Sequence, residues 1–503
     1  MLQRTDDLPQ LIGDYKPFDQ WQAHLNRLFY GLRGDKLRSY YQTFASADYR
    51  LAHALAADYY ERVIARDKAR GKGQGARGEK PEEESTPSLG PLASSQGSHR
   101  PSPLTPQPSP LTVLELGPGN GNLAACFLSH LKALDQKGTV YPRVRYLLVD
   151  WEQPVLDGAL AHPDLAAHLD RVEIHCGSIE NMADVADGTV DRIICNELWN
   201  ELPTKLMAKN AGEIEEEYIR PNLSESLHAT IQDWSGFVRA FEAKDLDRLK
   251  TFPPFLDDLV WEKEYRKVEW KDVPFRKTIT EFLKVMDEQV LAPVHLGAFA
   301  TLKEAKRLLA PEAVGFSAFD AGTGEMKVLN DPDKPCYGQF GGQYSFMINF
   351  ALIEHVAKHL GMEQVALEPQ REFVGRSLNT NVITLMDLLA THPSAGPNLR
   401  PWEQDRLVLK TIKALNETYE SPYSHALAYP LGQDMPPEER DTLKGMLLSL
   451  KRQGVPDTVA YLTEEELTRA ANDLEGVGYD PDTLSIALTA PPSPIEYCHF
   501  FCR

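Results

Sequence analysis

The stretch Leu111-Thr-Val-Leu-Glu115-Leu-Gly117-Pro-Gly119-Asn-Gly121-Asn-Leu123 decides the expected fold of this 503-residue chain. A β-rich apolar run ends in an acidic residue and three alternating glycines, and an amphipathic segment follows. This pattern is typical of a parallel strand that leads into a helix at a nucleotide-binding site. Glycines permit a tight turn and let a ligand touch the backbone directly. The alternative is a glycine-rich turn that binds no ligand.

The spacing of the glycines bears on which ligand is expected. They follow a G-x-G-x-G pattern, and Asn122 stands where the dinucleotide fingerprint G-x-G-x-x-G has its last glycine. This difference favours S-adenosyl-L-methionine (SAM) over NAD, with S-adenosyl-L-homocysteine as the product. We expect the donor to contact Glu115, Gly117, Gly119 and Gly121.

Apolar strand-like runs alternate with helical segments before and after a long insertion at 204–302. Strands are expected over 113–116, 145–150, 171–176, 191–196 and 314–320. Buried strands joined by helices indicate an α/β fold with a doubly wound, mostly parallel, Rossmann-like sheet. An amphipathic helix is also expected over 346–360, where Gly361 would end it.

Changes in composition divide the chain into parts. A Pro/Gly/Ser-rich run cannot bury enough apolar surface to offset its ordering entropy, which indicates disorder. An insertion after a strand's carboxyl end overhangs the ligand crevice, so the long insertion is expected to be a substrate cap that starts with a hairpin near Asn210 and is helical afterwards. The expected parts are an N-terminal helical segment (1–66), a disordered linker (67–110), a SAM-binding domain (111–203 and 303–400), the cap (204–302) and a C-terminal helical domain (401–503).

Composition and charge narrow the class of partner. The net charge of −20 argues against nucleic acid, because phosphate binding requires a basic face. The N-terminal sequence lacks a signal-peptide pattern, and no stretch approaches the ~20 apolar residues of a membrane helix. Six scattered cysteines indicate reduced thiols, so a cytoplasmic protein without membrane insertion is expected. The segment 498–502 could chelate a metal, but it has no second ligand pair nearby, and no metal site is predicted.

Polar residues at the ends of the second and third strands are candidates for donor binding. Asp150 ends the second strand, where a carboxylate can accept hydrogen bonds from ribose hydroxyls. Ser178 and Ile179 follow the third strand, where an adenine would lie. The alternative for Asp150 is a polar strand terminus without a ligand.

The segment Asn196-Glu197-Leu-Trp-Asn-Glu201-Leu-Pro203 is the candidate acceptor site. Asn196 ends the fourth strand beside the expected sulfonium and would line the transfer site. Glu197 and Glu201 are four residues apart, so one helical turn would place both carboxylates on one face. Two carboxylates beside a methyl donor suit the guanidinium of arginine, which remains protonated at ordinary pH. The alternative is a solvent-facing capping pair.

Together, Glu115–Gly121 and Asn196–Pro203 resemble the MidA-like family of class I SAM-dependent methyltransferases, whose patterns there are roughly ELGPGxGxL and NEfxDALP. Further matches are the hairpin after Pro203, Phe319–Gly322 and Ile348–Phe350. The resemblance implies a class I methyltransferase fold and protein arginine methylation, with a respiratory complex subunit as the substrate. The mitochondrial relative is an arginine methyltransferase that acts on a complex I subunit.

This chain departs from the family pattern at several positions. In the second motif, Asn200 replaces the usual Asp and Glu201 replaces the usual Ala. Gln343 stands where the family has an Asp in a later loop, and Asp150 stands where it has a Glu at the end of the second strand. SAM binding should survive these changes, whereas the acceptor can differ. Two other functions therefore stay open: a small-molecule methyltransferase, and a non-catalytic assembly factor that keeps the fold.

Overall fold

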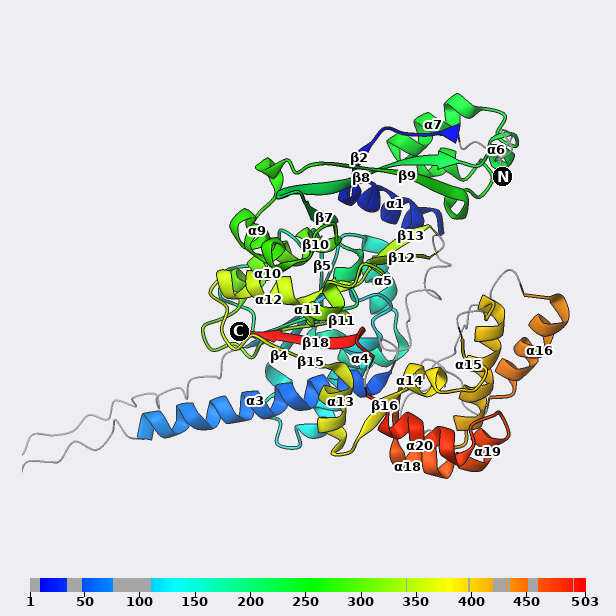
Figure 1. Cartoon of the computed structure of the whole chain (residues 1–503). Helices are drawn as coiled ribbons and strands as arrows, with labels where there is room; N and C mark the ends of the chain where they lie inside the picture. Colours follow the sequence, from blue (N-terminus) through cyan, green and yellow to red (C-terminus); the bar gives the residue numbers. More distant parts are fainter. Residues whose placement is uncertain are drawn as a thin grey trace, which may run out of the picture.

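An open, mostly parallel sheet forms the centre of the molecule in the computed structural model, which describes residues 10–33, 48–75, 110–340, 342–396, 399–418, 431, 435–450, 460–491 and 493–503 (Figure 1). The strand order is β5-β4-β3-β6-β11-β18-β15, and β14 also pairs with β11. All neighbours are parallel except β18, which is antiparallel to both β11 and β15. The strands are β3 (Leu111–Leu116), β4 (Val144–Asp150), β5 (Val172–Cys176), β6 (Arg192–Asn196), β11 (Gly315–Thr323), β14 (Ile348–Asn349), β15 (Ala366–Pro369) and β18 (Glu496–Cys502).

The predicted doubly wound sheet is therefore confirmed, and the five expected strands are β3, β4, β5, β6 and β11. The chain order reverses between β3 and β6, and ligands bind at such a switch point in open α/β sheets. The expected C-terminal helical domain needs correction, because its last residues form β18 inside this sheet. The side chains of Cys498 and Cys502 are buried in that strand.

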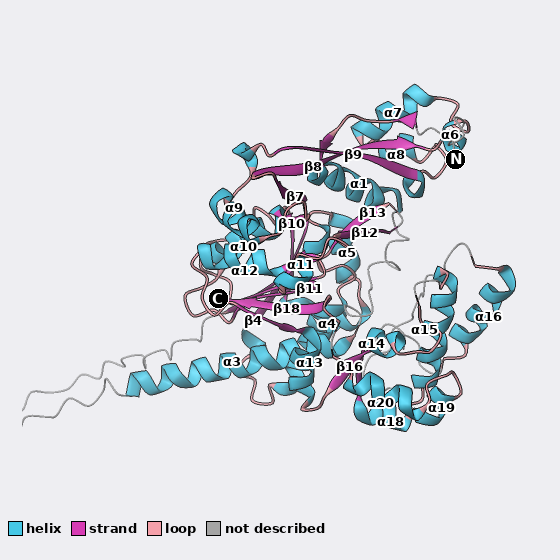
Figure 2. Ribbon diagram, in the orientation of Figure 1, coloured by secondary structure: helices cyan, strands magenta, loops and turns pink. Residues whose placement is uncertain are grey.

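Helices cover both faces of the central sheet (Figure 2). One face carries α3 (Tyr49–Gly75), α4 (Asn122–Leu134), α5 (Gln153–Leu160) and α13 (Gln370–Leu378), with Val113 and Tyr146 among the core residues below them. The other carries α9 (Arg276–Val285), α10 (Leu296–Leu308) and α12 (Phe350–His359), over Leu114 and Ile193. Alternate residues of a strand point to opposite faces, so β3 contributes to both cores.

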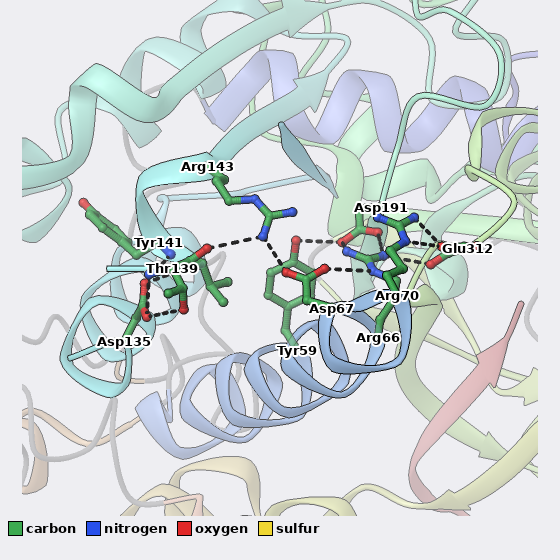
Figure 3. Close-up of polar contacts among 11 residues, drawn as sticks. Tyr59, Arg66, Asp67, Arg70, Asp135, Thr139, Tyr141, Arg143, Asp191 and Glu312 are labelled. Carbon is green, nitrogen blue, oxygen red and sulfur yellow. Dashed lines mark hydrogen bonds and ion pairs between the residues drawn. The ribbon is translucent and has the colours of Figure 1, made fainter. Parts of the chain in front are cut away.

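The long helix α3 is tied to the amino-terminal edge of the sheet by polar contacts (Figure 3). The Tyr59 hydroxyl donates to Asp191 over 2.8 Å, and Arg66 pairs with the same carboxylate. Asp67 pairs with Arg143 over 2.6 Å. Because α3 continues to Gly75, the first part of the predicted linker is helical, which is a second correction. Residues 76–109 lie outside the described part of the chain.

A second, antiparallel sheet lies beyond the carboxyl edge of the central one, at the top of Figure 1. It contains β1 (Gln10–Leu11), β2 (Lys16–Pro17), β7 (Thr204–Asn210), β8 (Glu213–Leu223), β9 (Leu259–Lys267) and β10 (Ala292–His295). The predicted hairpin is β7–β8, with Ala211 and Gly212 at positive φ in its turn. Helices α1 (Phe18–Arg33), α6 (Glu225–His228), α7 (Trp234–Ala243) and α8 (Leu246–Leu249) belong to the same unit.

The expected hairpin is present, but the rest of the segment expected to form the cap differs from the prediction. β9 was expected to be helical and instead extends the hairpin, because Leu259–Lys267 pairs with β8 along its whole length. Helices α9 and α10 belong to the core of the central sheet rather than to a cap. The helix expected over 346–360 begins only at Phe350, because the preceding residues form β13 (Gln343–Phe346) and β14; β13 pairs with β12 (Tyr337–Phe340).

The remaining described helices gather mainly in the C-terminal part. A small sheet of β16 (Val382–Thr384) and β17 (Tyr461–Thr463) joins this part to the rest of the chain. No helix in the described segments is long and apolar enough to span a bilayer. The helices are α11 (Met326–Leu329), α14 (Leu385–Ala390), α15 (Pro401–Leu415), α16 (Pro437–Leu448), α18 (Glu464–Arg469), α19 (Ala471–Glu475) and α20 (Pro481–Thr489).

Candidate active site

The glycine loop between β3 and α4 is built around backbone that only glycine adopts easily. Gly117, Gly119 and Gly121 have φ values of 65°, 53° and 83°. A Cβ at Gly121 would lie 2.7 Å from the Ala159 carbonyl oxygen, and one at Gly117 would lie 3.2 Å from Leu198. The loop therefore leaves bare backbone at the N-terminus of α4, where amide groups and the helix dipole favour an anionic or hydrogen-bonding ligand.

Glu115 lies below this loop and inside the core. Its carboxylate accepts a hydrogen bond from Tyr146 over 2.8 Å, and only 2% of the residue is exposed. Burial raises the pKa of Glu115 to about 8. A neutral carboxyl hydrogen-bonded to Tyr146 fits a supporting role under the loop better than a direct contact with the donor's ammonium group.

The ends of β4 and β5 meet beside the loop. The Gly177 amide donates to the Asp150 carbonyl over 2.9 Å, and the Asp150 carboxylate accepts from the Glu152 amide over 2.9 Å. Burial raises the pKa of Asp150 to about 6. Ser178 is exposed and accepts from the Glu180 amide, whereas Ile179 packs partly against the core. The three predicted donor residues Asp150, Ser178 and Ile179 thus share one edge of the sheet.

The segment after β6 does not form the helical turn that the four-residue spacing predicted. Glu197 has φ of 48°, and its amide donates to the Phe319 carbonyl over 2.7 Å. A short 3-10 helix over Trp199–Glu201 follows. The two glutamates are therefore not on one face of a helix: Tyr497 of β18 donates to Glu197 over 3.3 Å, while Glu201 is bonded by Tyr30 of α1.

Glu201 is held by residues that are distant in sequence. The Tyr30 hydroxyl donates to its carboxylate, and the Gln343 amide donates to the Tyr30 oxygen over 2.9 Å. Burial raises the pKa of Glu201 to about 7, with a further increase from the charge of Asp150. Hydrogen bonds from Tyr30 and Gln343 act in the opposite direction, because they stabilise the charged form.

Asp320 of β11 is a third carboxyl group that the charges of both glutamates affect. Its carboxylate accepts from the amides of Asn200 over 3.0 Å and Ala321 over 2.9 Å. Burial raises the pKa of Asp320 well above its usual value, and the charges of Glu197 and Glu201 raise it further. Glu197 and Glu201 thus lie near enough to Asp320, at the carboxyl edge of β6 and β11, for their charges to act on it.

Two acceptor atoms at this spot have no hydrogen-bond partner within the described chain. They are the buried Oδ1 atoms of Asn196 and Asn200. Buried polar atoms are rarely left unsatisfied in native structures, so a ligand that donates hydrogen bonds here would satisfy them. Trp199, in contrast, is fully buried and donates to Thr301 over 2.8 Å, which makes it a core residue rather than a pocket wall.

Sequence reasoning missed four contributors to the site: Tyr30, Asp320, Gln343 and Tyr497. Asp320 could have been found, because it lies at the predicted carboxyl end of a sheet strand. Gln343 was noted only as a departure from a family pattern. Tyr30 and Tyr497 lie near opposite ends of the chain, and no local signal points from either to the acceptor segment.

Comparison with known proteins agrees with this geometry. Residues 101–309 match the family model described as "Putative S-adenosyl-L-methionine-dependent methyltransferase". The chain contains a SAM-dependent methyltransferase domain. The family's description makes SAM the cofactor of this methyltransferase, and the matched range includes the glycine loop. No curated protein matches the chain significantly.

Several solved structures resemble the methyltransferase at low identity. Two come from Burkholderia thailandensis: an uncharacterized protein (17% identity, 79% of this chain and 83% of that chain, TM-score 0.43) and a protein bound to S-adenosyl-homocysteine (15%, 79% and 84%, TM-score 0.42). A SAM-dependent methyltransferase from Aquifex aeolicus also matches (13%, 51% and 74%, TM-score 0.23). The fold assignment itself rests on the strand order described above.

The residues of the glycine loop and its neighbours fit the cofactor. Gly121 lets the loop pack closely against the Ala159 backbone of α5, and Asp150 offers carboxylate oxygens beside the loop, at the end of β4. Hydroxyl groups of a ribose are hydrogen-bond donors that such a carboxylate accepts well.

Proposed function

We propose that the methyltransferase methylates a nitrogen of a protein side chain, with arginine as the first candidate. One observation carries this proposal: several oxygen atoms that can accept hydrogen bonds gather at the carboxyl edge of β6 and β11, which we take as the methyl-acceptor site. Glu197, Glu201 and Asp320 supply carboxyl oxygens, and the Oδ1 atoms of Asn196 and Asn200 have no hydrogen-bond partner among the described residues. A guanidinium carries five N–H donors and no acceptor, so it complements such a group of oxygens.

The donor half of the proposed site uses the residues at the switch point. Backbone around Gly117, Gly119 and Gly121 would contact the methionine part of the donor. Asp150 would accept from the ribose hydroxyls, and Ser178 with Ile179 would line the adenine pocket. Asn196, at the end of β6, would lie where the donor and acceptor meet. Glu115 would support the loop from below through its bond to Tyr146.

The chain's own residues then have mainly a positioning task. Bound SAM supplies a methyl group on a sulfonium that needs no further activation. Glu197 and Glu201 would orient the acceptor nitrogen by accepting hydrogen bonds from the other guanidinium nitrogens. The second sheet and α1 overhang this edge, and exclusion of water there would strengthen each of these polar interactions.

A labelling experiment tests the proposed substrate class. The protein is incubated with methyl-labelled SAM and a cell lysate, and label is followed in protein and in small molecules. The proposal expects label on protein, on arginine after hydrolysis, with a respiratory complex subunit as the first candidate to examine by mass spectrometry. Label on metabolites alone would replace the proposal with a small-molecule methyltransferase. No turnover, together with no binding of S-adenosylhomocysteine, would favour an assembly factor.

Two variants test the proposed acceptor clamp. Glu197→Gln and Glu201→Gln keep the shape of each side chain and remove its charge. Each should lower methyl transfer by about tenfold or more, because a charge-assisted hydrogen bond is lost, while binding of S-adenosylhomocysteine changes little. Unchanged transfer in both variants would show that these roles are wrong.

A further inference from the structure

Helix α1 presents one polar stripe to the segment that follows β6. Gln22, Asn26 and Tyr30 are spaced by four residues, so they lie on one face of the helix. Gln22 donates to the carbonyl oxygens of Glu201, over 3.2 Å, and Leu202, over 2.9 Å, and accepts from the Thr204 amide over 2.8 Å.

Asn26, in the middle of the stripe, ties α1 to the segment after β6 and to β13. Asn26 donates to the Glu201 carbonyl over 3.1 Å and accepts from the Tyr344 amide over 3.1 Å. Both Gln22 and Asn26 are buried. The position of α1 against Glu201 is therefore set by hydrogen bonds from the Gln22 and Asn26 side chains to backbone groups, and it does not depend on the Glu201 side chain.

The last residue of the stripe reaches the Glu201 side chain. The Tyr30 hydroxyl donates to the Glu201 carboxylate and accepts from Gln343 of β13 over 2.9 Å. A hydroxyl that receives one hydrogen bond is polarised to donate another more strongly. Gln343, Tyr30 and Glu201 thus form a directed chain that ends on the carboxylate.

The other charged groups near Glu201 oppose its ionisation. Asp150, from the end of β4, adds negative charge beside it, and Asp320 of β11 is coupled to it as well. Burial acts in the same direction. Among the groups acting on this carboxyl, the hydrogen bonds from α1 and β13 are those that favour the charged form.

We propose that Tyr30 is a positioning residue of the methyltransferase: with Gln343 behind it, Tyr30 fixes the direction of the Glu201 carboxyl group and favours its charged form for a cationic acceptor. This inference rests on the proposed function for the acceptor role of Glu201. It makes α1 part of the active site, although α1 lies outside the segment that matches the methyltransferase family model.

The test measures the ionisation of Glu201 directly in the full-length protein. Carboxyl absorption is followed by infrared difference spectroscopy between pH 5 and 9, and the Glu201→Gln spectrum identifies the band. We expect a titration near pH 7 in the parent, since the pKa of Glu201 is raised to about 7 by burial. Tyr30→Phe should move this titration upward by roughly one pH unit or more, because a hydrogen bond to the charged form is removed.

Two further variants separate a specific effect from a general one. Gln343→Leu should move the Glu201 titration in the same direction by a smaller amount, and it serves if Tyr30→Phe folds poorly. Tyr15→Phe removes a hydroxyl that donates to Glu262 over 3.2 Å, remote from the acceptor spot, and should leave the titration unchanged.

An unchanged Glu201 titration in Tyr30→Phe and Gln343→Leu would overturn the inference. Methyl transfer by the parent is assayed alongside: its absence would count against the proposed function, whereas the infrared result would still decide what Tyr30 does to Glu201. With an active parent, the acidic limb of the kcat/KM profile should move upward with the infrared titration in Tyr30→Phe.

Discussion

The hydroxyl of Tyr497 donates to the carboxylate of Glu197 over 3.3 Å, although 300 residues separate them in the chain. Tyr497 lies in β18, which enters the central sheet antiparallel between β11 and β15. β18 therefore lies inside the central sheet and also brings a hydroxyl group to Glu197, a residue of the proposed acceptor site.

Removal of this hydroxyl should affect transfer more than donor binding. In Tyr497→Phe, Glu197 loses a hydrogen bond that orients it, so methyl transfer should fall about tenfold while the affinity for S-adenosylhomocysteine stays within about twofold. Tyr265→Phe is the matched control, because its hydroxyl donates to Glu217 over 2.9 Å in the second sheet. Equal activities of the two variants, measured with labelled SAM, would remove Tyr497 from the site.

The glycine loop should not tolerate a side chain at Gly121. Gly121→Ala would pay for positive φ and would also place a Cβ 2.7 Å from the Ala159 carbonyl. Gly188→Ala is the control, since Gly188 has φ of 63° and nothing lies within 4 Å of its added Cβ. Urea unfolding should show a loss of about 1–2 kcal/mol for Gly188→Ala and a larger loss for Gly121→Ala. Equal losses would mean that the close approach to α5 is absent.

The buried carboxyl group of Glu115 should make the free energy of unfolding depend on pH. Its pKa is raised by burial from 4.5 to about 8, so the folded state binds this proton more tightly than the unfolded state. The resulting stabilisation is fully present below about pH 4.5 and is lost as the pH rises through about 8. Relative to Glu115→Gln, the parent should therefore lose about 1–3 kcal/mol of unfolding free energy between pH 5 and 9.

Urea unfolding at several pH values checks this prediction. The exposed Glu173 on β5, paired with Arg145 over 2.5 Å, offers a control. The unfolding free energy of Glu173→Gln should change with pH in the same way as that of the parent. Curves for Glu115→Gln that also run parallel to the parent would show that Glu115 is not desolvated in the folded state.

A buried polar chain should stabilise the strands around β18. Ser317 of β11 accepts from Arg192 over 2.7 Å and contacts His499 over 2.7 Å, and His499 contacts Glu368 over 2.9 Å. Ser317 is fully buried, so these contacts are structural. Ser317→Ala would remove one hydrogen-bond partner from each of the buried Arg192 and His499 and should cost about 1–3 kcal/mol in urea unfolding. The exposed Ser485→Ala is the control, and equal stability of both variants would contradict this assignment.

Much of the central sheet could be predicted because its signals are local. Apolar runs, the glycine loop and the polar strand ends all lie within short windows, and they placed Asp150 and Asn196 at the correct edge. β18 was missed because a seven-residue strand beside a long helical stretch carries no sign of its partner. Only pairing with β11 and β15 makes Cys498–Cys502 part of the sheet.

The acceptor spot was predictable only in part for a related reason. The four-residue spacing of Glu197 and Glu201 suggested a helical turn, but the bond from the Glu197 amide to Phe319 holds a left-handed residue instead. Tertiary contacts override local periodicity at this position. Tyr30 and Gln343 meet Glu201 only after α1 and β13 have folded against it.

A calorimetric titration of S-adenosylhomocysteine into the parent and into Gly119→Val tests most directly whether the glycine loop binds the methyl donor. Gly119 has φ of 53°, so a β-branched residue there would be strained and would obstruct the loop backbone that the donor is proposed to contact. The account predicts one bound nucleoside per parent chain and at least about tenfold weaker binding by the variant, with folding confirmed by its thermal unfolding. Equal affinity of the two proteins, or no binding by the parent, would contradict it.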